Sequence, residues 1–151
     1  MNVPPAELAG NDKKLAEFIE GQLAGSPAEG KGLGSHFVAA GRKYEVDPLA
    51  LTAIARHETG YGKLGVGLRK MLGVGAYDAN PNGRTKFDGA VNQIYSGAKT
   101  FSNLRRKGGS NAQAPLGQQL SAVNRAGWAT DRGWHGKVAG HYNKIVKGGR
   151  A

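Results

Sequence analysis

The sequence predicts a mainly helical protein of the α+β class, with a helical lobe and a small lobe of irregular structure and short β-strands. Apolar residues recur at the three- and four-residue spacing of an α-helix in six stretches of the chain. Glycine accounts for 25 of the 151 residues, and the glycines cluster between these stretches, which indicates tight, irregular loops. We therefore expect short helices joined by loops, with one lobe of a different character.

The length of the chain and its 39% of hydrophobic residues suit one domain with a real core. We expect this domain to span residues 1–151. Residues 1–34 form an N-terminal helix and a linker, because residues 25–34 are rich in Gly, Ser and Pro. Residues 35–147 form the core that carries the motifs described below.

The first two helices are predicted at residues 12–23 and 35–45. In the first helix the apolar side chains at helical spacing are Leu15, Phe18, Ile19 and Leu23. In the second helix Ser35 is the expected N-cap, since its hydroxyl can accept a hydrogen bond from a free backbone N–H group.

The third helix is predicted to begin at Asp47 and Pro48. The Asp47 carboxylate can accept hydrogen bonds from the free N–H groups of the first turn, and Pro48 has the φ angle that this turn needs. The helix is apolar on nearly all sides, so we expect it to be buried. It ends at Gly60 or Gly62, because glycine readily adopts the left-handed conformation that terminates a helix.

Residues 61–87 have a different pattern, with many glycines and only short apolar pieces. We interpret them as loops with two or three short strands. Helices resume at residues 91–107, with Asp88 as the expected N-cap, and two more follow at 116–126 and 134–146.

The charge of the chain is unevenly distributed. The net charge is +10, of which residues 1–58 contribute −2 and residues 59–151 contribute +12. Such a balance favours an anionic partner. Nucleic acid, an acidic membrane surface and an anionic bacterial cell wall all satisfy this requirement.

The composition excludes several classes of protein. The chain has no cysteine, which excludes disulfides, thiolate metal sites and cysteine nucleophiles. His135 and His141 do not share a helical face and no third ligand is evident, so we expect no metal and no cofactor. No apolar run approaches the roughly 18 residues of a membrane span. Residues 1–10 lack the basic region and apolar stretch of a signal peptide.

Glu58 is the strongest candidate for a catalytic residue. It lies at the end of the predicted buried helix, just before a glycine-rich loop. The negative end of the helix dipole and partial burial both favour the protonated form of its carboxyl group, which a general acid requires. The alternative is an exposed glutamate in the last turn of a fraying helix.

Residues 44–62 form a motif around Glu58, with the sequence Tyr-Glu-Val-Asp-Pro-Leu-Ala-Leu-Thr-Ala-Ile-Ala-Arg-His-Glu-Thr-Gly-Tyr-Gly. This motif resembles a segment of lysozyme-like peptidoglycan hydrolases. In those enzymes an aromatic residue, a turn ending in Asp-Pro or Asn-Pro and an apolar helix precede Glu-Ser/Thr-Gly-x-Gly. The resemblance implies a lysozyme-like fold, and it assigns the role of catalytic acid to Glu58.

Two further segments narrow the resemblance. Residues 71–78, Met-Leu-Gly-Val-Gly-Ala-Tyr-Asp, are similar to a stretch of glycoside hydrolase family 73. Residues 127–131, Gly-Trp-Ala-Thr-Asp, resemble that family's Tyr-Ala-Thr-Asp segment, which precedes an aromatic residue and a final helix. Order and spacing agree over residues 33–147, and the chain lacks the Gly-Leu-Met-Gln stretch that is typical of lytic transglycosylases. The resemblance therefore favours an endo-β-N-acetylglucosaminidase.

Four residues near these motifs are candidates for binding a sugar: Tyr61, Tyr77, Trp128 and Asp131. Trp128 replaces the family's tyrosine, so a phenolic oxygen is missing, whereas stacking on a sugar face remains possible. Asp131 has the alternative role of fixing the turn in which it lies. His57 stands where the family often has a small residue, and it either tunes the acid or packs.

A second catalytic group is less well defined. Glycosidases usually need two carboxyl groups, and only Asp78, Asp88 and Asp131 follow Glu58 in the chain. Asp78 is the candidate, because it falls in the segment that resembles the family's substrate-binding lobe. The alternative is assistance by the N-acetyl group of the substrate, so that no second carboxylate attacks carbon.

We therefore expect a peptidoglycan hydrolase that cleaves β-1,4 glycosidic bonds of the bacterial cell-wall glycan, as an N-acetylglucosaminidase with Glu58 as general acid. A muramidase or lytic transglycosylase is the alternative on the same substrate. Alternatives of other classes are a basic nucleic-acid-binding module and a domain that binds the glycan without cutting it.

The expected partners are bacterial peptidoglycan and anionic wall polymers, the latter attracted by the basic residues. We expect a monomer, with no nucleic-acid partner and no membrane span. The expected place of action is the bacterial cell wall. Without a signal peptide, the protein would be released by holin-mediated lysis, carried on a virion or excised from a larger secreted protein, so a phage origin is one option.

Overall fold

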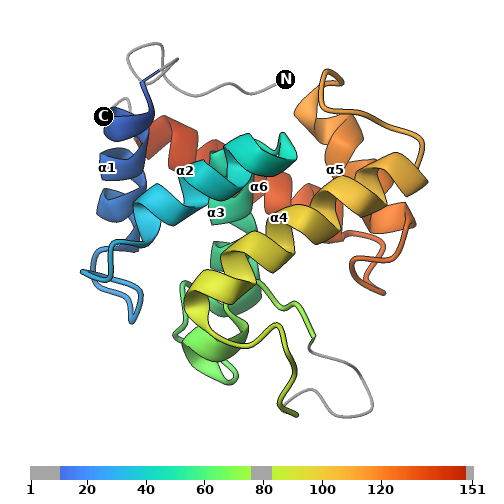
Figure 1. Ribbon diagram of the computed structural model, residues 1–151. Helices are drawn as coiled ribbons and strands as arrows, with labels where there is room; N and C mark the ends of the chain where they lie inside the picture. The colour runs from blue at the N-terminus through green and yellow to red at the C-terminus, as the bar shows by residue number, and fades with distance from the viewer. Residues whose placement is uncertain (1–10, 76–82, 149–151) are drawn as a thin grey trace.

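The computed structural model describes residues 11–75 and 83–148, which fold into helices packed around one central helix (Figure 1). In these residues the elements are α1 (Asp12–Leu23), α2 (Leu33–Tyr44), α3 (Pro48–Thr59), the short 3-10 helix η2 (Gly67–Lys70), α4 (Ala90–Lys107), α5 (Leu116–Arg125) and α6 (Trp134–Gly148). The predicted mainly helical architecture is confirmed. None of these helices is long and apolar enough to cross a membrane.

The expected strands of the small lobe are absent from the part of residues 61–87 that the structure describes. The segment forms turns and η2 instead, and it lies at the lower end of the molecule in Figure 1, drawn in green. A strand needs consecutive extended residues, and left-handed φ angles interrupt this segment repeatedly. The glycines with such angles are Gly62, Gly65, Gly67, Gly73 and Gly75.

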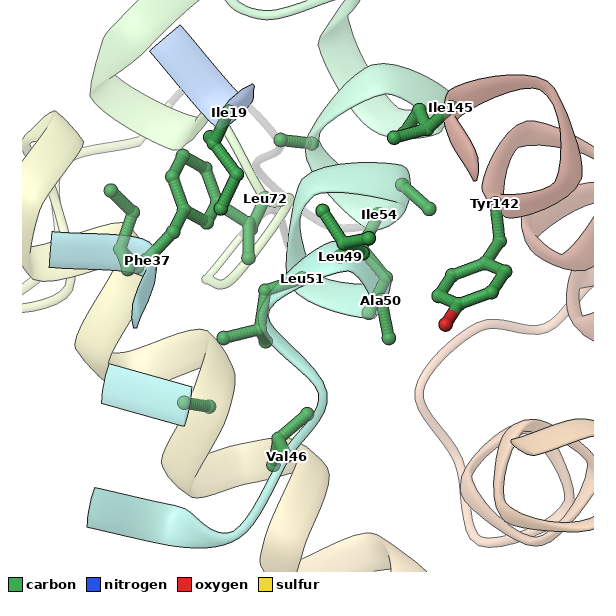
Figure 2. Close-up of a cluster of buried hydrophobic side chains, with 14 of the residues drawn as sticks. Ile19, Phe37, Val46, Leu49, Ala50, Leu51, Ile54, Leu72, Tyr142 and Ile145 are labelled. Carbon is green, nitrogen blue, oxygen red and sulfur yellow. The ribbon is translucent and has the colours of Figure 1, made fainter. Parts of the chain in front are cut away.

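Helix α3 is the centre of the hydrophobic core. Every residue from Pro48 to Ala55 is buried, as the apolar pattern predicts. Side chains of α1, α2 and α6 converge on this helix, among them Ile19, Phe37 and Ile145 (Figure 2). Each fully enclosed leucine or isoleucine on α3 stabilises the fold by about 2 kcal/mol relative to an exposed one.

Both ends of α3 form as the sequence predicts. The Asp47 carboxylate accepts a hydrogen bond from the N–H of Leu49 at 2.9 Å, and Pro48 occupies the first turn. Gly60 terminates the helix in the left-handed conformation, with a φ angle of 58°. The termination leaves Glu58 in the last turn.

Asp47 also joins the start of α3 to α6. The Tyr142 hydroxyl donates a hydrogen bond to the second carboxylate oxygen, Oδ2, at 2.6 Å. Burial raises the pKa of Asp47, although the hydrogen bonds from Tyr142 and Leu49 oppose the rise. Burial and the adjacent carboxylate also raise the pKa of Tyr142. The Tyr142 hydroxyl is therefore held as a neutral phenol that donates to Asp47.

Two predicted helix caps are wrong. Helix α2 begins at Leu33 after Gly32, and the Ser35 hydroxyl donates to the Gly32 carbonyl instead of accepting a backbone N–H. Helix α4 has Gly89 at its N-cap without a side-chain hydrogen bond. The Asp88 carboxylate is engaged by Arg69 at 2.8 Å and by Lys70 at 2.7 Å, and these contacts lower its pKa.

Replacing Tyr142 with Phe should lower the free energy of unfolding by about 1–3 kcal/mol, since the ring remains while the partly buried Asp47 carboxylate loses a donor. Urea unfolding followed by circular dichroism measures the effect. Tyr95→Phe is the matched control. Its hydroxyl contacts His36 Nδ1 at 3.3 Å in a half-buried position, and we expect a change below about 0.5 kcal/mol. Equal effects of the two variants would contradict the role assigned to Tyr142.

Candidate active site

Glu58 is half-buried at the end of α3 and contacts the beginning of α6. The indole N–H of Trp134 donates a hydrogen bond to Glu58 Oε2 at 2.9 Å. Trp134 is only 1% exposed, so its ring is fixed in position. Oε2 of Glu58 therefore accepts from an indole N–H, a group that can donate a hydrogen bond but cannot accept one.

The other oxygen, Oε1, faces the loop that follows η2. A Cβ atom at Gly73 would lie 2.8 Å from Oε1, and Gly73 has a φ angle of +80°. Both facts favour glycine at this position, since a side chain would strain the backbone and displace the carboxylate. The two oxygens of Glu58 therefore have different surroundings, an indole donor at Oε2 and a close backbone at Oε1.

Gln93 on α4 holds this loop in place. Its side-chain oxygen accepts hydrogen bonds from the N–H groups of Leu72 and Val74, both at 3.1 Å. Its amide group donates to the carbonyls of Val74 and Phe87, both at 2.9 Å. A fully buried side chain thus satisfies four backbone groups on both sides of Gly73.

The sequence interpretation missed Gln93, although a signal was present. Gln93 lies one residue before Ile94 and four before Gly97, on the face of α4 that is buried. A polar residue on an apolar helix face needs hydrogen-bond partners.

Thr59 connects the end of α3 to the same loop. Its hydroxyl donates to the carbonyl of Met71 at 2.9 Å and accepts from the N–H of Gly62 at 2.9 Å. The residue that follows Glu58 is therefore anchored to the loop that carries Gly73.

A pocket of about 280 Å³ borders Gly73 on the side of α4. Val74, Phe87 and Leu104 provide apolar lining, and Thr100 provides a hydroxyl. Trp128 lines the pocket and stacks on Trp134 with ring centroids 5.5 Å apart. Apolar walls with a few polar groups suit a ligand that has both apolar faces and hydroxyl edges, as a sugar ring has.

The remaining predicted site residues have different positions. Tyr61 is 8% exposed and does not line this pocket, and burial raises the pKa of its hydroxyl to about 12. Asp131 is exposed. It accepts hydrogen bonds from the Gly133 N–H at 2.8 Å and from Lys137 Nζ at 2.7 Å, so it does fix the turn before α6. Tyr77 and Asp78 lie outside the described residues.

Lys137 also favours the ionised form of Asp131. Its hydrogen bond holds the pKa of Asp131 below the usual range, with support from the Gly133 N–H.

His57 is half-buried, and its ring centroid lies 5.4 Å from that of His141. Burial lowers the pKa of His141, and Arg56, His57 and Lys144 lower it further. His57 therefore packs on the side of α3 that faces α6.

Within residues 11–75 and 83–148, no group of three His, Cys, Asp or Glu side chains could hold a metal ion. Comparisons of the chain with protein-family models, with curated proteins and with solved structures find no match. What this site can do chemically is therefore inferred from its own residues.

Replacing Gln93 with Ala should lower the free energy of unfolding by at least about 3 kcal/mol, because four buried or partly buried backbone groups lose their partner. Alanine is a good helix former, so the helix itself is not weakened. Chemical unfolding measures the change. Gln118→Ala, at an exposed position of α5, is the matched control and should stay within about 0.5 kcal/mol. A Gln93 variant as stable as the control would refute this account of the loop.

Proposed function

We propose that the protein is a peptidoglycan hydrolase with a lysozyme-like fold, and that it cleaves β-1,4 glycosidic bonds of the cell-wall glycan with Glu58 as general acid. The observation that carries the proposal is the position of the Glu58 carboxylate. It lies in the last turn of a buried helix and is oriented by Trp134. Gly73, which lies against its Oε1, lines the same pocket as Trp128. The resemblance of residues 44–62, 71–78 and 127–131 to family 73 enzymes supports the same activity.

In this mechanism the acidic proton is carried by Oε1. The indole N–H of Trp134 occupies Oε2 and can only donate, which leaves Oε1 as the oxygen that gives a proton to the glycosidic oxygen. The bond from the glycosidic oxygen to the anomeric carbon then breaks. Water adds its hydroxyl to that carbon, and its remaining proton goes to the Glu58 carboxylate or to the second catalytic group where that group acts as base. A sugar ring stacked on Trp128 would present the bond from the side of Gly73.

The group that stabilises the anomeric carbon remains open between two candidates. Asp78 would act as base or nucleophile from the segment that follows Gly75. In the alternative, the N-acetyl carbonyl oxygen of the substrate attacks the anomeric carbon, and Glu58 alone is required from the protein. The substrate's own amide makes the second route chemically self-sufficient.

The same geometry suits three related activities. An N-acetylglucosaminidase and a muramidase differ in which sugar precedes the broken bond. In a lytic transglycosylase the C6 hydroxyl of the same sugar, and not water, attacks the anomeric carbon. Residues 71–78 and 127–131 favour the first of these. The basic residues after Glu58 would concentrate the enzyme on an anionic wall.

Glu58→Gln should lower the rate of wall hydrolysis by between about one hundredfold and ten thousandfold, the range typical of losing a general acid. Glutamine retains an oxygen that can accept from Trp134, so the fold should remain intact. The measurement is the release of reducing ends from purified cell walls. Mass spectrometry of the products after borohydride reduction identifies the sugar at the new reducing end. Glu17→Gln on the exposed face of α1 is the matched control. Unchanged lysis by the Glu58 variant would rule out the proposed function.

Trp134→Phe should lower kcat about tenfold and leave KM nearly unchanged. The variant keeps an aromatic ring in the core but removes the hydrogen bond that orients Glu58, and such a hydrogen bond contributes roughly 0.5–1.5 kcal/mol. Trp128→Ala should instead raise KM, because Trp128 lines the pocket and does not contact the acid. Steady-state kinetics on soluble glycan fragments separates the two effects. The same change in KM for both variants would argue against a positioning role for Trp134.

A further inference from the structure

A second pocket adjoins the one that Trp128 lines. It has a volume of about 550 Å³ and lies between the end of α5, the loop after it and the first turn of α6. Gly127 lines both pockets. The two pockets therefore lie on either side of one residue, next to Trp128.

This second pocket is positively charged. Arg125, Arg132 and His135 line it, and no acidic residue does. Arg125 donates to the Ser121 hydroxyl at 3.0 Å and to the Gly108 carbonyl at 2.8 Å, and neither acceptor neutralises its charge. Arg132 is exposed and makes no ion pair with a carboxylate in the described parts of the chain. Two guanidinium groups are therefore left without an anionic partner.

Asn124 fixes the third basic group. Its amide nitrogen donates to the carbonyls of Asp131 at 3.0 Å and Ala129 at 3.4 Å, which orients its oxygen toward α6. That oxygen accepts from the backbone N–H of His135 at 3.1 Å and lies 2.9 Å from His135 Nδ1. Since the oxygen can only accept, Nδ1 carries the hydrogen.

We propose that this pocket binds a carboxylate of the peptide attached to the glycan, an inference that rests on the proposed function. Peptidoglycan carries a short acidic peptide on alternate sugars, so a glycan seated against Trp128 has carboxylates within reach of the adjoining pocket. Guanidinium groups match carboxylates in shape and charge, since two parallel N–H donors can meet both oxygens. Arg132 is the principal ligand, because its guanidinium forms no ion pair within residues 11–75 and 83–148.

The binding step can be tested without catalysis. The probe is the free wall peptide released from purified peptidoglycan by an amidase, titrated into the full-length protein and followed by NMR of the backbone amides. Shifts should concentrate in residues 125–135. Arg132→Ala should weaken binding about tenfold, which is equivalent to about 1.4 kcal/mol. Lys31→Gln removes the same charge at an exposed position in the linker and should leave the affinity unchanged.

Three results would overturn the proposal. In the first, no shifts occur in residues 125–135. In the second, the Arg132 and Lys31 variants weaken binding equally, which would indicate a response to net charge alone. The third involves a phosphodiester wall polymer as a separate probe. If it binds the same amides as tightly as the peptide, the pocket is a general anion site.

A second measurement links the pocket to hydrolysis. Wild-type protein should have a lower KM for peptide-bearing glycan than for glycan stripped by the amidase, and Arg132→Ala should abolish that preference while leaving the stripped glycan unaffected. An equal loss on both substrates would contradict the proposal. If the wild type cleaves neither substrate, the proposed function fails, whereas the peptide titration still decides whether the pocket binds carboxylates.

Discussion

The burial of α3 is the constraint on which the rest of the structure depends. A helix that is apolar on all sides must be enclosed by others, and its two ends are where polar groups can occur. Both ends carry a carboxylate, Asp47 at the start and Glu58 in the last turn. Helix α6 supplies an aromatic donor to each of them, Tyr142 to Asp47 and Trp134 to Glu58. Because the start of α6 meets the end of α3, the two helices run antiparallel.

This arrangement assigns different tasks to rigid and irregular parts of the chain. Glu58 and Trp134 lie on packed helices, so the orientation of the carboxylate is fixed before any ligand arrives. The glycine-rich segment instead lets the backbone come close to Glu58, because Gly73 has no side chain to keep it away from Oε1. Gln93 holds the residues on either side of Gly73 without a strand, because its side chain makes the hydrogen bonds that a neighbouring strand would provide.

Local patterns in the sequence predicted the helices well and their tertiary partners poorly. The bounds of α1 and the start and end of α3 follow from apolar spacing, Asp47, Pro48 and Gly60, all of which act within a few residues. Asp88 was a plausible cap on the same local grounds. Its carboxylate is taken instead by Arg69 and Lys70, which are 19 and 18 residues away. A rule based on neighbouring residues cannot predict that competition. The predicted strands were wrong because the left-handed φ angles of the glycines arise only in the folded loop.

The candidate site shows the same division between local and long-range information. Glu58 could be selected from its place at the end of an apolar helix. Its partner Trp134 is 76 residues further along the chain, so the spacing in the sequence could not indicate the contact. An aromatic residue near the C-terminal motif was equally compatible with core packing. Trp134 does pack in the core, at 1% exposure, while its indole N–H donates to Glu58.

The first turn of α6 connects the two pockets through neighbouring residues. Trp134 orients Glu58 and stacks on Trp128, which lines the glycan pocket of the proposed function. His135 lines the second pocket, together with Arg125 and Arg132, and Asn124 holds both the backbone N–H and the ring of His135. Contacts in either pocket therefore bear on the turn that orients the acid. Contacts in the two pockets would then hold a substrate against a carboxylate that the packed helices have already oriented.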